Sequence, residues 1–175
     1  SIFVSDGHSG QGMTSDEALQ KGLASGATAR VIKFSADGKR LMEWGKLGVR
    51  HGEFRTPHAM AFDSQGRLWV VDRGNHRLEI FDQEGKHLDT WYQFSRISGL
   101  HIAADDTLYA IDSESDDNYN PGWRKGLRVG SARPGEVWPS VPEHVSKQPS
   151  GRGGVVPMGE GVTVDGQGNV YAGEV

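Results

Sequence analysis

A short pattern occurs twice in this chain at a constant spacing. It reads F-x-x-x-G-K-x-L-x-x-W, and subtracting 47 from the numbers of the copy that begins at Phe81 gives the copy that begins at Phe34. A repeat with a period of about 40 to 50 residues indicates one supersecondary unit copied in tandem, each copy burying its apolar faces against its neighbours. The repeat therefore constrains both the fold and the place where a functional site should be sought.

A second pattern, D-x-x-G-x-L-x-x-x-D, marks a hairpin in each repeat. Residues 63–72 carry it, and it recurs with substitutions 40 positions later, at 103–112, and 62 positions after that, at 165–174. The second copy has Ala103 and Asp106 for the first Asp and the Gly, and the third has Val170 and Glu174 for the Leu and the last Asp. Each copy places a turn between two apolar segments, which is typical of a β-hairpin. After the first copy, segments 77–81 and 86–91 supply a third and a fourth strand. The sequence therefore predicts an all-β fold, a β-propeller of four-stranded antiparallel blades.

The whole chain, 1–175, is interpreted as part of one propeller domain that covers about three and a half blades. The blade portions are 1–44, 57–91, 98–138 and 158–175. Two insertions interrupt the repeat, at 9–28 and 113–157. In the first insertion, Ser15 is expected to cap a short helix that carries Leu19 and Leu23 on one face. An incomplete ring exposes two sheet edges, so we expect the rest of a longer polypeptide or a second chain to supply the missing blades.

The composition indicates a globular chain. Hydrophobic residues make up 35% of it, charged residues 24%, and the formal net charge is −4. Because the chain contains no cysteine, disulfides, thiolate metal sites and a cysteine nucleophile are excluded. An acidic chain offers little to a nucleic-acid backbone, and no apolar run approaches the roughly 18 residues of a membrane span. We therefore expect neither a nucleic-acid partner nor a membrane partner.

One blade resembles an NHL repeat: the segment PHAMAFDSQGRLWVVDRGNHRLEIFDQEGK carries the D-x-x-G, V-x-D-R-x-N-x-R and F-D-x-x-G signatures of that family. This resemblance implies six blades in the complete protein. The runs VSDGH, RVIKFSADGK, GEF-x-x-PH and VVDR are also similar to the catalytic core of the peptidyl-α-hydroxyglycine α-amidating lyases. That similarity implies a metal-dependent lyase or hydrolase, and it slightly favours a periplasmic or secreted location.

The similarity to the lyases also implies roles for particular residues. His58, in a Pro-His pair, stands at the position of a zinc ligand, and Arg73 at that of an arginine that acts in substrate binding and catalysis. His8 follows Ser-Asp-Gly, where the lyases carry an active-site tyrosine, and Glu160 replaces the histidine of a later Pro-His-Asp triplet. We therefore expect His58 and Glu160 to hold a metal, zinc or calcium, and Arg73 and His8 to serve in catalysis.

The internal repeat indicates the same site independently of the similarity to the lyases. His58, Ser98 and Glu160 each stand 14 positions before the closing acid of their blade, so each is expected to begin an innermost strand facing the central channel. A histidine and a carboxylate there suit zinc, together with further ligands, although such residues also line channels for structural reasons. Arg73 and His8 break the repeat, which favours a functional role. A salt bridge for Arg73 and a solvated loop position for His8 are the alternatives.

The closing acids Asp6, Asp72, Asp112 and Glu174 recur in every blade, which favours an architectural role in which each accepts N–H groups of the following turn. Segment 114–120 is acidic and offers oxygens for calcium, with a solvated loop as the alternative, because its spacing differs from that of an EF-hand. Trp44 and Trp91 keep the repeat register and are expected to pack between blades. Five histidines receive no role: His51, His76, His87, His101 and His144.

Two functions remain open from the sequence. One is an enzyme that acts on a small-molecule or peptide ligand at the mouth of the central channel, near His58, Arg73 and His8. The other is a non-catalytic propeller scaffold that binds a protein or a peptide. The fold by itself does not decide between them, because propellers of one architecture serve many functions.

Overall fold

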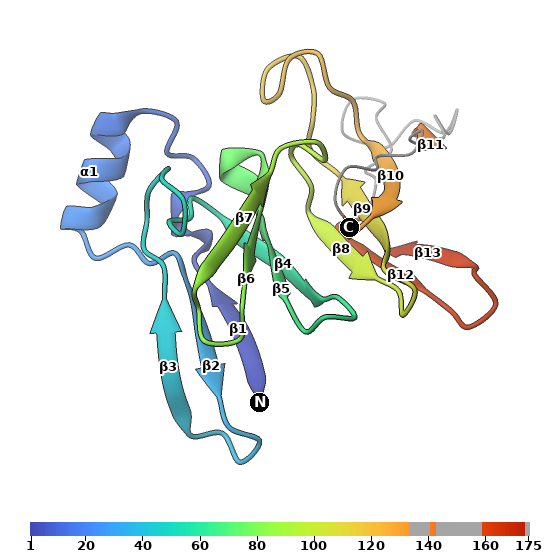
Figure 1. Ribbon diagram of the computed structural model, residues 1–175. Coiled ribbons are helices and arrows are strands. Elements are labelled where there is room, and N and C mark those ends of the chain that lie inside the picture. Colours follow the sequence, from blue (N-terminus) through green and yellow to red (C-terminus); the bar gives the residue numbers. More distant parts are fainter. Residues whose placement is uncertain (134–140, 143–158, 174–175) are drawn as a thin grey trace.

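The computed structural model describes residues 1–133, 141–142 and 159–173. Within them, consecutive antiparallel strands form four sheets (Figure 1). The first sheet contains β1 (Ile2–Asp6), β2 (Arg30–Phe34) and β3 (Arg40–Trp44). The second contains β4 (Pro57–Phe62), β5 (Leu68–Asp72), β6 (Arg77–Phe81) and β7 (His87–Trp91). The third contains β8 (Gly99–Ile102), β9 (Thr107–Asp112), β10 (Gly126–Ser131) and β11 (Val141–Pro142), and the fourth contains β12 (Gly161–Val164) and β13 (Val170–Gly173).

The first strands of successive sheets lie beside one another. β1 contacts β4, β4 contacts β8, and β8 contacts β12. Within each sheet the strands follow one another in chain order, so that β7 is the edge strand opposite β4. Sheets that meet along their first strands are the blades of a β-propeller, in which those strands surround the axis. The all-β propeller fold predicted from the repeat is confirmed, and six blades in the complete ring stay a prediction.

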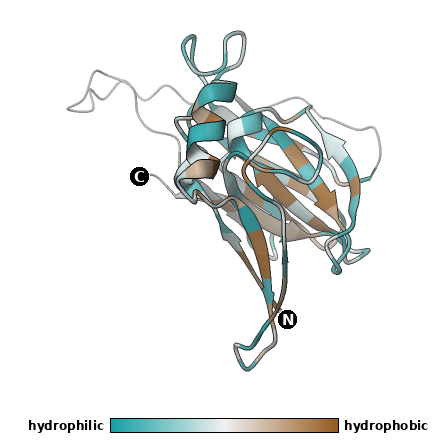
Figure 2. Ribbon diagram, turned by 90° about the vertical axis from the view of Figure 1, so that its left-hand side faces the viewer, coloured by the Kyte–Doolittle hydropathy of each residue, from teal (hydrophilic) through white to brown (hydrophobic). Residues whose placement is uncertain are grey.

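Two hydrophobic clusters contain buried residues of neighbouring sheets, and apolar residues follow the strands (Figure 2). Between the first and second sheets, the partly buried Trp44 packs on a cluster that includes the buried Phe81. Between the second and third sheets, the Trp69 and Trp91 rings lie edge to face with centroids 4.8 Å apart. Apolar burial of this kind is the main force that holds one blade against the next. The prediction that Trp44 and Trp91 pack between blades is confirmed.

The first insertion forms two short helices, η1 (His8–Gly10) and α1 (Asp16–Ala24). The Ser15 hydroxyl accepts a hydrogen bond from the Ala18 N–H at 3.2 Å, as expected for an N-cap. Leu19 is buried against the first cluster, whereas Leu23 is largely exposed. None of the helices in the described ranges combines the length and the apolar character that a membrane crossing requires.

The second insertion contributes strands as well as loops. β10 and β11 both lie within segment 113–157, and they extend the sheet begun by β8 and β9. The Gly- and Pro-rich end of this insertion lies outside the described residues. The same holds for His144 and for Glu174, the closing acid of the fourth blade.

Candidate functional site

The four residues that the sequence selects meet around the side chain of Arg73. Its Nη2 lies 2.9 Å from His8 Nε2, and its Nη1 lies 3.4 Å from Glu160 Oε1. Glu160 Oε2 is in turn 3.8 Å from His58 Nε2, and the rings of His58 and His8 have centroids 5.5 Å apart. Residues that are up to 152 positions apart in the sequence (8 to 160) are thus brought into one cluster, which we call the channel-mouth cluster.

Each of these side chains is placed by the end of an inner element. His58 is the second residue of β4, and Glu160 directly precedes β12. Arg73 begins the helix η2 (Arg73–Asn75) directly after β5, and its N–H donates to the Thr56 carbonyl at 3.0 Å. His8 begins η1, which is separated from β1 by Gly7 alone. The cluster therefore lies where β4 and β12 begin and where β1 and β5 end, near the propeller axis.

His58 presents one ring nitrogen to the cluster. Its Nδ1 donates to the Ser98 carbonyl at 2.8 Å, because a carbonyl can only accept, and so Nε2 carries the lone pair that faces Glu160. Burial lowers the pKa of His58, and the nearby Arg73 lowers it further. A neutral imidazole whose other nitrogen donates to a backbone carbonyl is the arrangement found in metal-ligating histidines.

Arg73 is the most buried member of the cluster, with 1% of its side chain exposed. It donates to Ser98 Oγ at 3.2 Å and pairs with Glu114 at 3.6 Å as well as with Glu160. Burial lowers the pKa of Arg73, while the two carboxylates oppose that shift. The structure thus gives Arg73 the ion pairs to neighbouring blades that the sequence left as an alternative, and it also places Arg73 against His8.

A pocket of about 360 Å³ adjoins this cluster. Glu114 connects the two, because it lies on the pocket wall and pairs with both Arg73 and Arg96. Tyr119 and Lys125 also line the pocket. The sequence did not single out Arg96 or assign Glu114 to this site. The one signal available was that Arg96 is a charged residue just before an inner strand.

The acidic segment 114–120 does not form a cage of oxygens in the described structure. Asp116 Oδ1 accepts the N–H groups of Asn118 and Tyr119, both at 2.8 Å. Asp117 pairs with Arg124, and the Asn120 side chain donates to two serines. Protein donors thus engage these groups individually. Among the described residues, the one group of three His, Asp or Glu side chains with ligand atoms all within 4.8 Å of one another is His51, Glu79 and His87, which lies outside the channel-mouth cluster.

The closing acids bind arginines as well as backbone. Asp112 Oδ1 accepts the N–H groups of Glu114 and Ser115, in the following turn, as predicted. Asp72 instead accepts the N–H groups of Arg55 and Thr56, which precede β4, so the prediction that it binds the following turn needs correction. In each of the three blades whose closing acid is described, the acid also pairs with an arginine of the strand that follows it. These pairs are Asp6 with Arg30, Asp72 with Arg77, and Asp112 with Arg128.

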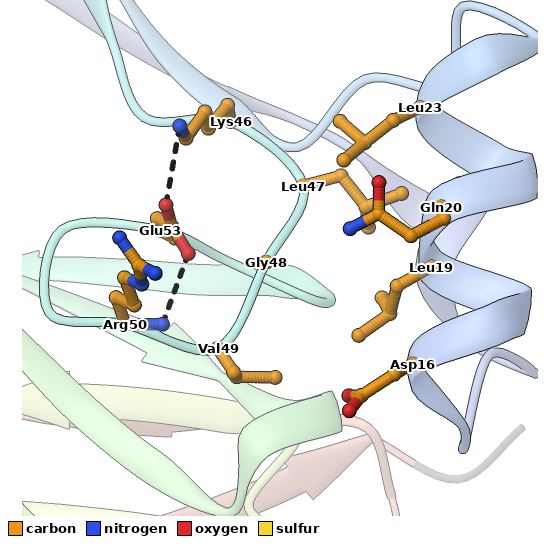
Figure 3. Close-up of a pocket in the computed structure, with 10 residues that line it drawn as sticks. All are labelled: Asp16, Leu19, Gln20, Leu23, Lys46, Leu47, Gly48, Val49, Arg50 and Glu53. Carbon is orange, nitrogen blue, oxygen red and sulfur yellow. Dashed lines mark hydrogen bonds and ion pairs between the residues drawn. The ribbon is translucent and has the colours of Figure 1, made fainter.

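A further hollow of about 390 Å³ separates α1 from the loop of residues 46–53 (Figure 3). Leu19 and Leu47 line its apolar side, and the Lys46–Glu53 ion pair of 3.3 Å lies within the loop. Glu53 also accepts the Arg50 N–H at 3.0 Å. None of the four residues of the channel-mouth cluster lines this hollow. Its importance is that these contacts fix the shape of the loop, which also carries His51.

Comparison with known proteins agrees with the blade architecture. Residues 54–81 match the NHL repeat model. Solved structures of U3-55K and of the RRP9 WD40 repeats superpose with TM-scores of 0.53 and 0.52 at 18% and 17% identity, over 78% of this chain and 37% of each of those chains. At such identity the superposition shows the fold alone. The fold and the repeat define the class of this protein: it is built of β-propeller blades.

More specifically, the chain carries an NHL repeat. It is 42% identical to human NHL repeat-containing protein 3 over 67 residues, which are 38% of this chain and 19% of that protein. It is also 38% identical to peptidyl-glycine alpha-amidating monooxygenase A of Xenopus laevis over 99 residues, with 49% of this chain and 10% of that protein covered. The matched part is thus a fifth or less of the length of these relatives.

Proposed function

We propose that the channel-mouth cluster is the active site of a metal-dependent enzyme related to the peptidyl-α-hydroxyglycine α-amidating lyases. The observation that carries the proposal is that His8, His58 and Glu160 converge near the guanidinium of Arg73. The four residues come from three different blades. The similarity to an amidating protein of Xenopus laevis supports the same reading. Buried charged groups that converge at a concave place are typical of functional sites.

His58 and Glu160 are the residues that would hold the metal. Nδ1 of His58 is engaged by the Ser98 carbonyl, so Nε2 is available as a ligand on the side that faces the Glu160 carboxylate. A nitrogen and a carboxylate oxygen favour zinc over calcium, which prefers oxygen ligands throughout. A bound zinc ion supplies a Lewis acid or lowers the pKa of a water molecule. The remaining ligands would come from outside the described residues.

Arg73 and His8 provide the proton chemistry of the proposed site. Because the Arg73 guanidinium can only donate, His8 Nε2 must accept, and the ring proton of a neutral His8 is therefore on Nδ1. His8 is exposed, so this N–H can reach a ligand in the channel mouth. Arg73 thus fixes both the tautomer and the orientation of an N–H group that can donate a hydrogen bond to the reacting part of a substrate.

The adjoining pocket indicates the substrate class. Arg96 and Lys125 line its wall together with Glu114 and Asp116. Its volume of about 360 Å³ suits a small molecule or the end of a peptide chain. We therefore propose a small or peptide substrate that carries an anionic group, such as a terminal carboxylate, which Arg96 would bind.

The alternative function is a non-catalytic scaffold whose channel mouth binds a protein or peptide. It is favoured by the ion pairs of Arg73 with Glu114 and Glu160, which neutralise its charge within the protein itself. Such a network is sufficient to lock neighbouring blades together without any chemistry.

Metal content and turnover separate the two functions. The full-length protein, purified without chelator, is expected to contain zinc and to cleave peptides that end in α-hydroxyglycine. The His58→Ala and Glu160→Gln variants should lose the turnover and contain one equivalent of zinc less than the parent protein, while the His101→Ala variant, which changes a histidine of the inner strand β8, should keep the parent zinc content and turnover. Equal zinc content and equal turnover in the His58→Ala and His101→Ala proteins would contradict the enzyme and leave the scaffold.

A further inference from the structure

A second cluster of histidines and a carboxylate lies on the outer part of the second blade. His51 belongs to the loop between β3 and β4, Glu79 to β6, and His87 to the edge strand β7. One ligand atom from each lies within 4.8 Å of the ligand atoms of the other two. β7 is the strand of its sheet farthest from β4, so this cluster is separate from the channel-mouth cluster.

The three side chains point at one place, which the hydroxyl of Thr90 occupies. Thr90 Oγ1 lies 2.8 Å from His51 Nδ1, 2.9 Å from His87 Nε2 and 2.7 Å from Glu79 Oε2. A hydroxyl has one proton to donate, so it can satisfy only one of these three groups as a donor. Two imidazole nitrogens and a carboxylate oxygen around one point form the donor set of a transition-metal site.

The carboxylate of the cluster is fully buried, with Glu79 at 0% exposure. Arg77 Nη2 lies 2.9 Å from Glu79 Oε1, which leaves Oε2 directed at His87 and Thr90. A buried charge must be paired or bind a metal, because its transfer from water is otherwise very costly. Here one oxygen is paired with an arginine, and the other faces the two histidines.

Arg77 also fixes the loop that carries His51. Its guanidinium donates to the carbonyls of Val49, Arg50 and Glu53 at 2.8 to 2.9 Å. One buried arginine therefore ties together the loop and the carboxylate, and so it sets the distance between His51 and Glu79. Partners of this kind orient the ligands of metal sites.

The histidine rings are preorganised as well. The rings of His51 and His87 are stacked, with centroids 5.3 Å apart and an angle of 29° between their planes. The buried Phe81 ring supports His87 from the side, with centroids 5.6 Å apart. The register of β6 and β7 explains why the side chains meet, because Glu79 is directly opposite Thr90 and Phe81 is directly opposite His87.

We propose that His51, Glu79 and His87 bind a divalent transition-metal ion, with zinc as the expected ion. Ligand atoms bound tetrahedrally at about 2.0 to 2.2 Å lie about 3.3 to 3.6 Å apart. The present arrangement, in which the ligand atoms lie within 4.8 Å of one another, therefore needs an adjustment of up to about 1.5 Å together with rotation of the Thr90 hydroxyl away from the centre. Three protein ligands leave at least one coordination position for water. The site is independent of the function proposed for the channel mouth.

Metal titration of the full-length protein tests this site apart from the other one. The chelator-treated His58→Ala protein, which lacks the ligand proposed for the channel mouth, is titrated with Zn²⁺ in competition with a chromophoric chelator and with Co²⁺ by its visible absorption. We expect one equivalent to bind. Addition of His51→Ala should weaken binding by at least about tenfold, and His87→Gln should do the same. Because His51 is exposed, its replacement is not expected to disturb the fold.

The matched control is His101→Ala in the same His58→Ala background. It removes a histidine from β8, in the third sheet, and should leave the affinity for Zn²⁺ unchanged. The affinity should follow the order Cu²⁺ above Zn²⁺ above Mn²⁺, and Ca²⁺ should not compete. Equal affinities in the His51→Ala and His101→Ala proteins, or no Zn²⁺ binding by the His58→Ala protein, would overturn the proposal.

Discussion

Arg73 Nη2 and His8 Nε2 lie 2.9 Å apart and join the first blade to the second at the channel mouth. The contact requires a lone pair on His8 Nε2, because a guanidinium has no acceptor. Since the Arg73 side chain is almost completely buried, water cannot take over its hydrogen bonds if it is removed, and the protein would lose stability. This single contact therefore joins two blades and requires one particular tautomer of an exposed histidine.

Replacement of Arg73 by lysine should destabilise the protein. A single ammonium group keeps the charge but cannot reach His8, Ser98 and Glu160 together, as the guanidinium does. We expect the free energy of unfolding to fall by about 1 to 3 kcal/mol, the cost of buried polar groups left without partners, as measured by urea denaturation. Arg40→Lys, at an exposed position of β3, is the control and should change stability by less than about 0.5 kcal/mol. Equal effects would show that the Arg73 contacts contribute little.

A pH effect is expected from His76. Burial lowers the pKa of His76, and Arg96 and Arg55 lower it further, with Asp112 as a weaker opposing charge. In the unfolded chain a histidine has a pKa of about 6.5. At pH values between the pKa of His76 in the folded protein and about 6.5, the unfolded chain therefore binds more protons than the folded protein does. Stability should fall as the pH is lowered through this range.

The variant His76→Asn tests this effect. Asparagine tolerates the left-handed backbone of this position, where φ is 56°, and does not titrate. Chemical denaturation between about pH 7.5 and pH 5 should show a shallower loss of stability in the variant than in the parent. His101→Gln serves as the control and should keep the parent slope. Parallel slopes for the His76→Asn protein and the parent would show that His76 does not titrate in this range.

The closing acid Asp72 offers a test of the architectural role. Its carboxylate accepts two backbone N–H groups and pairs with Arg77, all without exposure to solvent. Asp72→Asn keeps the shape but leaves Arg77 without its full counter-charge, and loss of one partner of a buried pair costs about 3 to 5 kcal/mol. Thermal and urea denaturation should show the loss. Asp117→Asn, the same change at an exposed residue, should be almost neutral, and a neutral Asp72→Asn would contradict the role.

The repeat predicted the blades because a propeller blade is a local unit: its turns and strands are set by residues close in sequence. The convergence of His58 and Glu160 followed from the same logic, since equivalent positions in a repeat occupy equivalent places. Glu114 could not be found in this way, because an insertion has no counterpart in the other blades. Arg96 lies between two blade portions, in a segment that the repeat does not align. The cluster around His51 was missed for a related reason: it joins a loop to two strands through Arg77, a long-range contact that no spacing reveals.

The packing of neighbouring blades can be tested at Gly85, in the turn between β6 and β7. Its φ is +80°, and a Cβ added there would lie 2.8 Å from the Trp44 ring of the preceding blade, which Phe3 and Phe81 hold in place. Gly26, also at φ +80°, is a matched control because a Cβ there would meet nothing within 4 Å. Both Gly→Ala changes should cost about 1 to 2 kcal/mol for the left-handed backbone.

Gly85→Ala should cost about 1 to 3 kcal/mol beyond that, because overpacking forces a rigid indole ring to move. Urea denaturation measures both free energies of unfolding, and tryptophan fluorescence should report displacement of Trp44 in the Gly85→Ala protein alone. If the two variants lose the same stability, the blades must be able to shift apart at this turn without cost, and the interface would then depend on the buried cluster around Phe81 rather than on the close approach of Gly85 to Trp44.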